Sequence, residues 1–265
     1  MRIRTVCGTG AAVLALLGAG LQAPAAGTGD AATPAVSSAR PTGIFDGAER
    51  AVIGRRIIGR SVKDRPIRAY HVGDPDADRT VVVISAMHGN EQQTPRPLIH
   101  LRDHQPITGV NMWLIPVMNP DGFRRDSRKN AHGVDLNRNF PVGWRDLDGN
   151  YESGPKPASE PETRAVLRFL RRIDPDRMIS LHQPLFAVDA KHSKNPRFSR
   201  RVARAMRLPI DTVDCGGVCH GTMTMWFNRR LDGASITVEL SGNPSGTYLR
   251  NTAPTGILRA VGGSR

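Results

Sequence analysis

Cysteine is scarce in this sequence. The 265 residues contain three cysteines, of which Cys7 lies close to the N-terminus. So few cysteines exclude the disulfide-rich scaffolds of small extracellular domains. The other two, Cys215 and Cys219, stand in "DCGGVCHG". With only His220 beside them they fall short of a closed four-ligand zinc site, so we expect them to form a disulfide in an oxidising compartment.

A membrane-spanning run is also missing. The basic start "MRIR" precedes an apolar stretch to about Leu21, which glycines interrupt and which is shorter than the ~20 apolar residues of a membrane span. The small-residue stretch "QAPAAG" follows. This order predicts a signal peptide over residues 1–26. The mature protein is therefore expected to be secreted, extracellular or cell-wall associated, with no integral membrane segment.

Large apolar residues are rare in residues 27–48, where Ala, Gly, Ser, Thr and Pro dominate. This composition predicts a flexible linker or a short pro-segment. Residues 49–265 are long enough for one domain with a substantial core. They contain no internal repeat, and we expect a monomer.

Acidic residues are outnumbered by basic ones. The formal net charge is +13, or +11 once Arg2 and Arg4 leave with the signal peptide. A protein this basic is drawn to polyanions. No helix-turn-helix, zinc-finger or RNP-like pattern is present, so we expect no nucleic acid partner. An anionic cell-wall polymer or a membrane surface is the expected counter-charge, with a generic solvated surface as the alternative.

Strand-like and helix-like segments alternate along the domain, which favours an α/β fold. A hairpin is predicted around residues 63–65, and strands over 79–87, 110–118, 177–182 and 234–240. Helices are predicted over 91–104, from a capping box at Ser159 and Glu162, over 195–208, and after Pro254. The arginines of the 195–208 helix share one side, which is either a solvated face or a wall-docking surface. "NPDG", residues 119–122, is expected to be a turn.

Three predicted strands end in reactive residues: His88, His182 and Glu239. Ligands of open α/β sheets bind beyond the carboxyl ends of the strands. His88 and Glu91, three residues apart, can reach one ion from a single turn, and His182 is the obvious third ligand. Two His and one Glu with an open fourth position is a standard set for catalytic zinc. An isolated HxxE pair is nevertheless a weak signal.

The intervening segments make the pattern specific. "NPDG", "SRKNAHGVDLNRNFP", "SEPET" and "ITVEL" follow in order. From about residue 59 to residue 240, the chain resembles the zinc metallocarboxypeptidase (funnelin) family. Within it, the chain is most similar to the short bacterial branch of murein peptide amidases and γ-D-glutamyl-diaminopimelate peptidases. The resemblance implies a single-domain α/β/α sandwich with a central mixed, mostly parallel twisted sheet, and makes residues 49–265 a zinc peptidase catalytic domain.

The resemblance also implies residue roles. His88, Glu91 and His182 would bind one Zn²⁺ ion, and Glu239 would be the general base. Arg128 would polarise the scissile carbonyl. Asn137 and Arg138 would hold the free carboxylate of the substrate. The chemistry suits these residue types, since a carboxylate outside the ligand set can take a proton from water and a guanidinium grips a carboxylate with two donors.

The sequence also departs from the digestive members of the family. The active-site tyrosine roughly twenty residues before the base is missing, and we take His220 as the candidate replacement. The expected side-chain pocket includes Thr222, Met223 and Thr224, which offer neither an acid nor a base. Asn90 replaces the arginine between the first two ligands, so digestive-type carboxypeptidase activity is in doubt.

These residues favour a secreted zinc exopeptidase or amidase that acts next to a residue with a free carboxylate. The γ-D-Glu-diaminopimelate bond of peptidoglycan peptides is the expected target. Three alternatives remain: a broad metallocarboxypeptidase on ordinary peptides, an aspartoacylase-like deacylase, and a non-catalytic wall-binding module.

Overall fold

A computed structural model describes residues 48–190, 193–213 and 215–265. The predicted signal peptide, and all of the predicted linker except residue 48, lie outside these residues. No helix among the described residues has both the length and the apolar character needed to cross a membrane.

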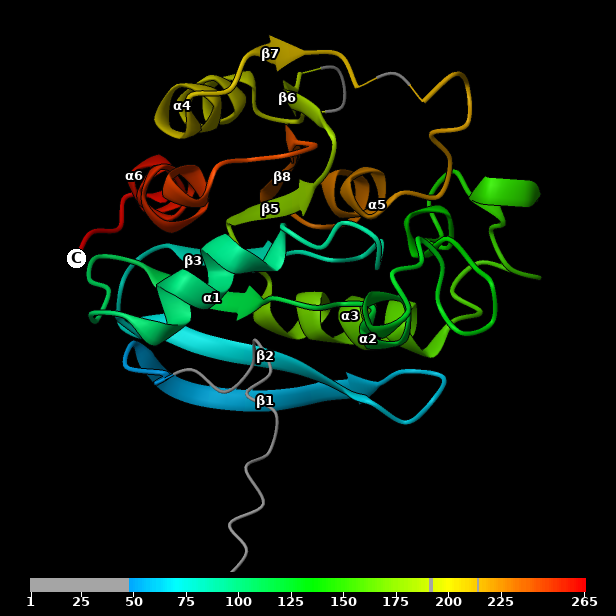
Figure 1. Cartoon of the computed structure of the whole chain (residues 1–265), viewed down its shortest axis with the longest axis horizontal. Coiled ribbons are helices and arrows are strands. Elements are labelled where there is room, and N and C mark those ends of the chain that lie inside the picture. The colour runs from blue at the N-terminus through cyan, green and yellow to red at the C-terminus, as the bar shows by residue number, and fades with distance from the viewer. Residues whose placement is uncertain (1–47, 191–192, 214) are drawn as a thin grey trace, which may run out of the picture. The chain divides into compact units, whose positions relative to one another are not determined.

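One sheet organises the described part of the chain (Figure 1). Its eight strands follow the order β1-β2-β4-β3-β5-β8-β6-β7. Their bounds are Val52–Arg60 (β1), Pro66–Gly73 (β2), Thr80–Ile84 (β3), Asn111–Ile115 (β4), Arg177–His182 (β5), Leu185–Asp189 (β6), Ile210–Asp211 (β7) and Ala234–Ser241 (β8).

The central strands β4, β3, β5 and β8 run parallel. β1 pairs antiparallel with β2, β2 with β4 and β6 with β8, whereas β7 pairs parallel with β6. The parallel strands are buried on both faces, which explains their continuous Val, Ile, Leu and Met runs. The predicted mixed sheet flanked by helices is confirmed.

Helices cover both faces of the sheet. They are α1 (Pro95–Asp103), α2 (Pro120–Arg124), α3 (Pro161–Ile173), α4 (Pro196–Met206), α5 (Met223–Arg230) and α6 (Ala253–Val261), with short turns η1 (Leu136–Arg138), η2 (Gly149–Tyr151) and η3 (Tyr248–Thr252). Side chains of α1, α4 and α6 pack into the core on one face, and those of α3 and α5 into the core on the other. Figure 1 shows α4, α6 and α1 stacked along one side.

Two local predictions are wrong. The capping box at Ser159 and Glu162 does not form: α3 begins after Glu160, and the Glu162 carboxylate instead accepts hydrogen bonds from Val62 N and Asn130 Nδ2. "NPDG" is not only a turn, because α2 begins inside it, with the Asn119 side chain accepting from Gly122 N at 2.9 Å.

Some elements were not foreseen. The strands β6 and β7 and the helix α5 lie in segments for which no element was predicted, and α1 begins only at Pro95, four residues beyond the predicted start. Proline suits the first turn of a helix, where its missing N–H costs no hydrogen bond. The residues before it, including Glu91, are thereby left free for another role.

Candidate metal centre and active site

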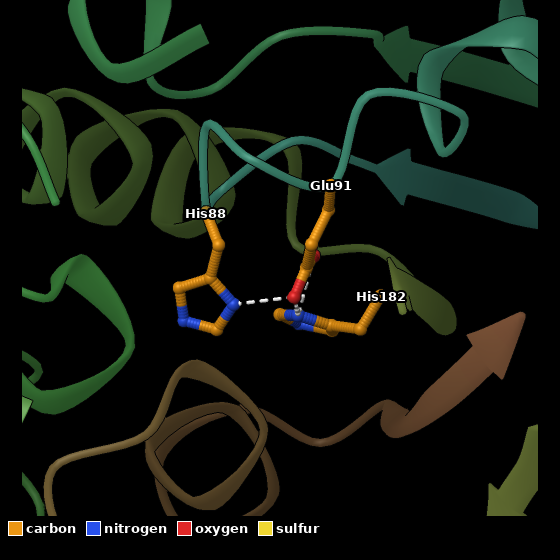
Figure 2. A group of neighbouring side chains, drawn as sticks. All are labelled: His88, Glu91 and His182. Carbon is orange, nitrogen blue, oxygen red and sulfur yellow. Dashed lines mark hydrogen bonds and ion pairs between the residues drawn. The ribbon is translucent and has the colours of Figure 1, made fainter. Parts of the chain in front are cut away.

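The three predicted ligands converge at one edge of the sheet. His88 and Glu91 follow β3, and His182 is the last residue of the neighbouring parallel strand β5. One ligand atom from each lies within 4.8 Å of the other two. Figure 2 shows the Glu91 carboxylate beside both imidazoles: its Oε1 lies 2.6 Å from His88 Nδ1, and its Oε2 lies 3.1 Å from His182 Nδ1.

The "NPDG" segment supports the loop that carries His88 and Glu91. Asn119 N donates to Ala86 O at 3.0 Å, and Asn119 Nδ2 donates to Met87 O at 3.2 Å. Gly89 packs so closely that a Cβ there would lie 2.0 Å from the carbonyl carbon of Gly122. Glycine between the two ligands therefore lets the loop approach this support.

Each histidine is held by its second ring nitrogen. His88 Nε2 lies 3.0 Å from Asp135 Oδ1, and His182 Nε2 lies 2.9 Å from Ser180 Oγ. Both Nδ1 atoms are thus directed to the common centre. Hydrogen bonding of the outer nitrogen to a carboxylate or hydroxyl fixes the tautomer of a metal-binding histidine.

The charges of the site are strongly coupled. Burial opposes the charged form of His88, but Glu91 and Asp135 outweigh it and raise the pKa of His88 to about 9. Burial favours neutral Glu91, yet the charges of His88 and His182 lower the pKa of Glu91 to about 2. Asp135, although buried, has a pKa well below its usual range because of His88 and Arg128. Two buried carboxylates thus remain ionised and favour positive charge at this centre.

The residues fit a zinc ion. Glu91 Oε2 is buried and accepts no hydrogen bond from any described residue, despite its distance of 3.1 Å from a histidine nitrogen. A buried carboxylate oxygen without a hydrogen bond is costly unless a cation occupies the remaining position. Two imidazoles and one carboxylate, with space for a fourth ligand, form a catalytic zinc set.

Glu239 lies beside the triad but is not part of it. It is the parallel-register partner of His182, and Leu185 N donates to its Oε2 at 3.5 Å. Burial, supported by the negative charge of Glu91, raises the pKa of Glu239 above its ordinary value. A carboxylate with a raised pKa next to a metal centre is suited to accept a proton from water.

A cationic group forms another part of the site. Arg138 is 3% exposed, and its Nε has no hydrogen-bond partner among the described residues, while its Nη1 donates to Asn137 O at 2.9 Å. The Asn137 Oδ1 accepts from Met223 N at 3.0 Å, which leaves the amide Nδ2 as the donor available to a substrate. Arg128 donates through Nε and Nη2 to Asp135 Oδ2 at 3.0 and 2.8 Å, which leaves Nη1 available.

The three candidate ligands, Glu239 and the polar groups of Arg128, Asn137 and Arg138 line one cavity of about 280 Å³. Tyr151 of η2 also lines it, and the guanidinium groups of Arg128 and Arg138 lie 5.4 and 5.0 Å from its ring centre. The remaining lining residues are Gln183, Pro184, Leu185, Asp189, Val213, Cys215, Cys219, Thr222, Thr224, Met225 and Thr237.

Two predicted substrate-binding residues are not brought to the cavity. Met223 is fully buried in the core, where it packs with α5 and α3, and its neighbours Thr222 and Thr224 line the cavity instead. His220 does not belong to the lining either. The structure joins Cys215 and Cys219 in a disulfide, and both line the cavity.

Four residues with a place in the site were not singled out from the sequence: Ser180, Asp135, Tyr151 and Asp189. A signal existed for Asp135, because an acid directly precedes "LNR" in the motif that carries Asn137 and Arg138. Ser180 stands two residues before His182, on the same side of its strand. The other two lie in segments without any motif, so only the tertiary structure identifies them.

Comparison with known proteins agrees with this geometry. The family model described as zinc carboxypeptidase matches residues 52–185. This chain belongs to the zinc carboxypeptidase family. Murein peptide amidase A of Escherichia coli (strain K12) is 33% identical over 176 residues, which cover 60% of this chain and 70% of that protein.

Solved structures of zinc carboxypeptidase-fold proteins also match. The murein-tripeptide amidase from Escherichia coli O157 aligns with a TM-score of 0.65 and 30% identity, covering 78% of this chain and 93% of that one. Carboxypeptidase A from Helicoverpa armigera aligns with a TM-score of 0.61 and 17% identity over 80% and 69% of the chains, which shows the shared fold. As a zinc carboxypeptidase family member with its ligand triad in place, the protein is a zinc hydrolase.

Proposed function

We propose that this protein is a secreted zinc peptidase that cleaves the γ-D-glutamyl–diaminopimelate bond of cell-wall peptides. The observation that carries the proposal is a single cavity lined by the metal triad, Glu239 and the buried Arg138. A carboxylate-binding arginine next to a hydrolytic centre suits substrates that end in a free carboxylate. Similarity to the murein peptide amidases supports a wall peptide as the substrate.

Three side chains would hold the ion: His88 and His182 through Nδ1, and Glu91 through its carboxylate. When bound there, zinc acidifies water and polarises a carbonyl. Glu239 accepts a proton as the water oxygen bonds to the amide carbon. It then delivers that proton to the amine nitrogen as the carbon–nitrogen bond breaks.

The arginines bind and orient the substrate. The buried Arg138, with Nδ2 of Asn137, holds the terminal carboxylate and so places the preceding amide bond over the metal centre. Arg128 keeps one nitrogen for the amide oxygen, because Asp135 engages its other two donor positions. A fixed guanidinium at that point stabilises the negative charge that develops on the oxygen.

The test compares two substrates. The zinc-loaded mature domain is incubated with L-Ala-γ-D-Glu-diaminopimelate and with an ordinary blocked L-dipeptide, beside Glu239→Gln, and the products are identified by mass spectrometry. Release of diaminopimelate from the first substrate only, lost in the variant, is the expected result. Cleavage of the dipeptide instead would indicate a broad carboxypeptidase. Absence of both products would favour a deacylase or a binding module.

Secretion belongs to the same proposal. It is supported by the signal-peptide pattern of residues 1–26, where a basic start precedes an apolar stretch and a small-residue site. Expression of the full chain with N-terminal sequencing of the extracellular form tests it. A new N-terminus near residue 26 or 27 is expected, whereas retention of Met1 inside the cell would contradict secretion.

An arginine groove, formed by α4 and α6, supports contact with an anionic wall polymer. It has a volume of about 530 Å³ and is lined, besides Ala205, by Arg197, Arg200, Arg201, Arg204, Arg207 and Arg259. All six arginines are exposed, and no ion pair joins them to a carboxylate within residues 48–190, 193–213 and 215–265. Like charges one helical turn apart destabilise a helix. A phosphate-bearing polymer would relieve that repulsion.

Binding to isolated wall material at low salt tests the groove. The triple variant Arg200→Gln, Arg204→Gln, Arg207→Gln is compared with Arg145→Gln, Arg229→Gln, Arg230→Gln, which removes the same charge from other exposed positions. Only the first variant should lose binding. Wall material stripped of its anionic polymer should bind neither the wild type nor the control variant. Equal losses in both variants, or stronger binding to DNA than to the wall polymer, would contradict the proposal.

A further inference from the structure

One irregular segment, residues 128–140, carries both arginines of the cavity. Arg128 stands at its start and Arg138 near its end, and both line the cavity. No strand of the sheet runs through this segment, and its regular structure is limited to the three-residue turn η1. Contacts other than strand pairing must therefore hold the two arginines in place.

The carboxylate of Glu160 contacts the first part of this segment. Glu160 is 2% exposed and does not belong to the cavity lining. Its Oε2 accepts a hydrogen bond from Asn130 Nδ2 at 2.7 Å and lies 2.7 Å from His132 Nδ1. Its Oε1 accepts from Ser159 Oγ, also at 2.7 Å. Both oxygens of a buried carboxylate are thus engaged, and one of them anchors the residue two positions after Arg128.

The same contacts reach the second part of the segment through Asn139. This residue is fully buried and directly follows Arg138. Its Nδ2 donates to Ser159 Oγ at 2.8 Å, and its Oδ1 accepts from Glu160 N at 3.2 Å. A chain of hydrogen bonds therefore joins Asn130 to Asn139 through the Glu160 carboxylate and the adjacent serine hydroxyl.

A second buried carboxylate close by makes a different connection. Glu162 is fully buried and also accepts from Asn130 Nδ2, at 3.1 Å, while its other oxygen accepts from Val62 N at 3.2 Å. In the part of the chain that the structure describes, no hydrogen bond joins its side chain to Ser159 or Asn139. It therefore ties the segment to the turn between β1 and β2, and it lacks the connection to the second arginine.

We propose that Glu160 is a positioning residue that holds Arg128 and Arg138 at a fixed separation. This inference rests on the proposed function, in which Arg138 binds the terminal carboxylate and Arg128 the oxygen of the amide bond to be cleaved. These two groups of the substrate are a fixed number of bonds apart, so both arginines can bind at once only if their separation is maintained. A fully hydrogen-bonded buried network is rigid, and a displacement of about 1 Å at the reacting groups can cost about 100-fold in rate.

The test asks whether Glu160 controls carboxylate recognition. Zinc-loaded wild type, Glu160→Leu, Glu160→Gln and Glu162→Leu are assayed on L-Ala-γ-D-Glu-diaminopimelate and on the same peptide with its terminal α-carboxylate amidated. The readout is the ratio of kcat/KM for the free and the amidated peptide. Leucine is similar in size to glutamate but accepts no hydrogen bond, whereas glutamine can still accept from Asn130 and donate to Ser159. Glu162→Leu is the matched control because it removes a carboxylate that is buried as deeply.

Wild type should prefer the free carboxylate by about 10- to 100-fold, the range of a hydrogen bond to a charged group. Glu160→Leu should lower this preference by about 10-fold, whereas Glu160→Gln and Glu162→Leu should keep it within about 3-fold of wild type. A purely structural role would slow both peptides equally and leave the ratio unchanged, which would overturn the proposal. Equal loss of the preference in Glu160→Leu and Glu162→Leu, or a wild type without any preference, would overturn it as well.

Ser159→Ala keeps the proposal testable if Glu160→Leu does not fold. It removes only the hydroxyl that joins Glu160 Oε1 to Asn139 Nδ2. The preference for the free carboxylate should fall by about 3-fold or more, the effect of losing one ordinary hydrogen bond. An unchanged ratio in this variant would contradict the proposal, because Asn139 would then be held without Glu160.

Hydrogen exchange separates this inference from the proposed function, since it requires no substrate. Amide exchange is followed by mass spectrometry in zinc-loaded wild type, Glu160→Leu and Glu160→Gln. If wild type cleaves neither peptide but exchange within residues 128–140 is faster in Glu160→Leu alone, the wall-peptide function fails and the positioning role stands. If wild type cleaves the wall peptide while neither exchange nor the ratio changes in Glu160→Leu, the function stands and the positioning role fails.

Discussion

Glu239 lies directly across from His182 in the parallel register of β8 and β5. Strand pairing alone therefore places the proposed base next to a metal ligand, 57 positions apart in the sequence. Both side chains are buried. Because two paired strands hold them, their separation is fixed by backbone hydrogen bonds, and this rigidity suits a proton transfer that needs the acceptor within reach of the reacting water.

Glu239→Gln tests the base directly. The amide keeps the shape of the side chain but cannot accept the proton, so kcat should fall by about 10²- to 10⁴-fold. Steady-state kinetics on the wall peptide measure this loss. Zinc content, determined by metal analysis, should stay at one ion per chain because Glu239 is outside the triad. Retention of more than a tenth of kcat would assign the proton transfer to another group.

Asp135→Asn tests the support of the metal site. Asp135 accepts from Arg128 and contacts His88, so its loss should weaken zinc binding by about 10- to 100-fold, as for other partners of metal-binding histidines. Competition with a chelator measures the affinity. Asp146→Asn, an exposed acid, serves as the control and should have no effect. If Asp135→Asn bound zinc as tightly as wild type, Asp135 would not be needed to position His88 for metal binding.

Arg138→Lys tests carboxylate recognition. Lysine keeps the charge but loses the planar pair of donors, so KM for the wall peptide should rise by about 10-fold or more, since one charged hydrogen bond is lost. The same peptide with an amidated terminus should be a poor substrate for wild type and variant alike. If the variant and wild type had the same KM, the carboxylate would bind elsewhere.

Tyr151 is expected to act through its ring. Its face contacts both Arg128 and Arg138, and each such contact contributes about 0.5–1 kcal/mol. Tyr151→Ala should therefore lower kcat/KM by about 5- to 20-fold, whereas Tyr151→Phe, which keeps the ring, should stay within about 2-fold of wild type. A Phe variant as impaired as the Ala variant would mean that the phenol hydroxyl touches the substrate.

His100 is expected to make the fold sensitive to acid. Burial, with the nearby charges of His104, Arg265 and Arg250, lowers the pKa of His100 from 6.5 to about 4. Between these two values only the unfolded chain takes up the proton. The stabilising contribution of neutral His100 is therefore complete above pH 6.5 and declines as the pH falls toward 4.

His100→Gln should accordingly lose less stability than wild type between pH 7 and pH 4.5. Urea unfolding at both pH values measures the change, and the variant at pH 7 is its own control for altered packing. An equal pH dependence in the two proteins would show that other groups cause the acid sensitivity.

The metal ligands and the proposed base were predictable from the sequence, because their residue types suit the chemistry and their order along the chain matches a known motif. His88, Glu91, His182 and Glu239 stand at the ends of strands with clear hydrophobic runs, and the structure brings them together. His220, which was chosen only by its position before the base, is not among the residues that line the cavity. The short strands β6 and β7 were missed because two to five residues give little periodicity.

The sequence by itself determined the family, the α/β alternation and the ligand set, since hydrophobic period and motif order are local properties. Only the tertiary structure decided which other side chains share the cavity. Asp189 and Tyr151 lie in segments without a motif, and their place depends on strand register and on packing against residues far away in the chain. Sequence patterns record spacing along the backbone, whereas the lining of the cavity depends on side chains from distant segments that come together only in the folded chain.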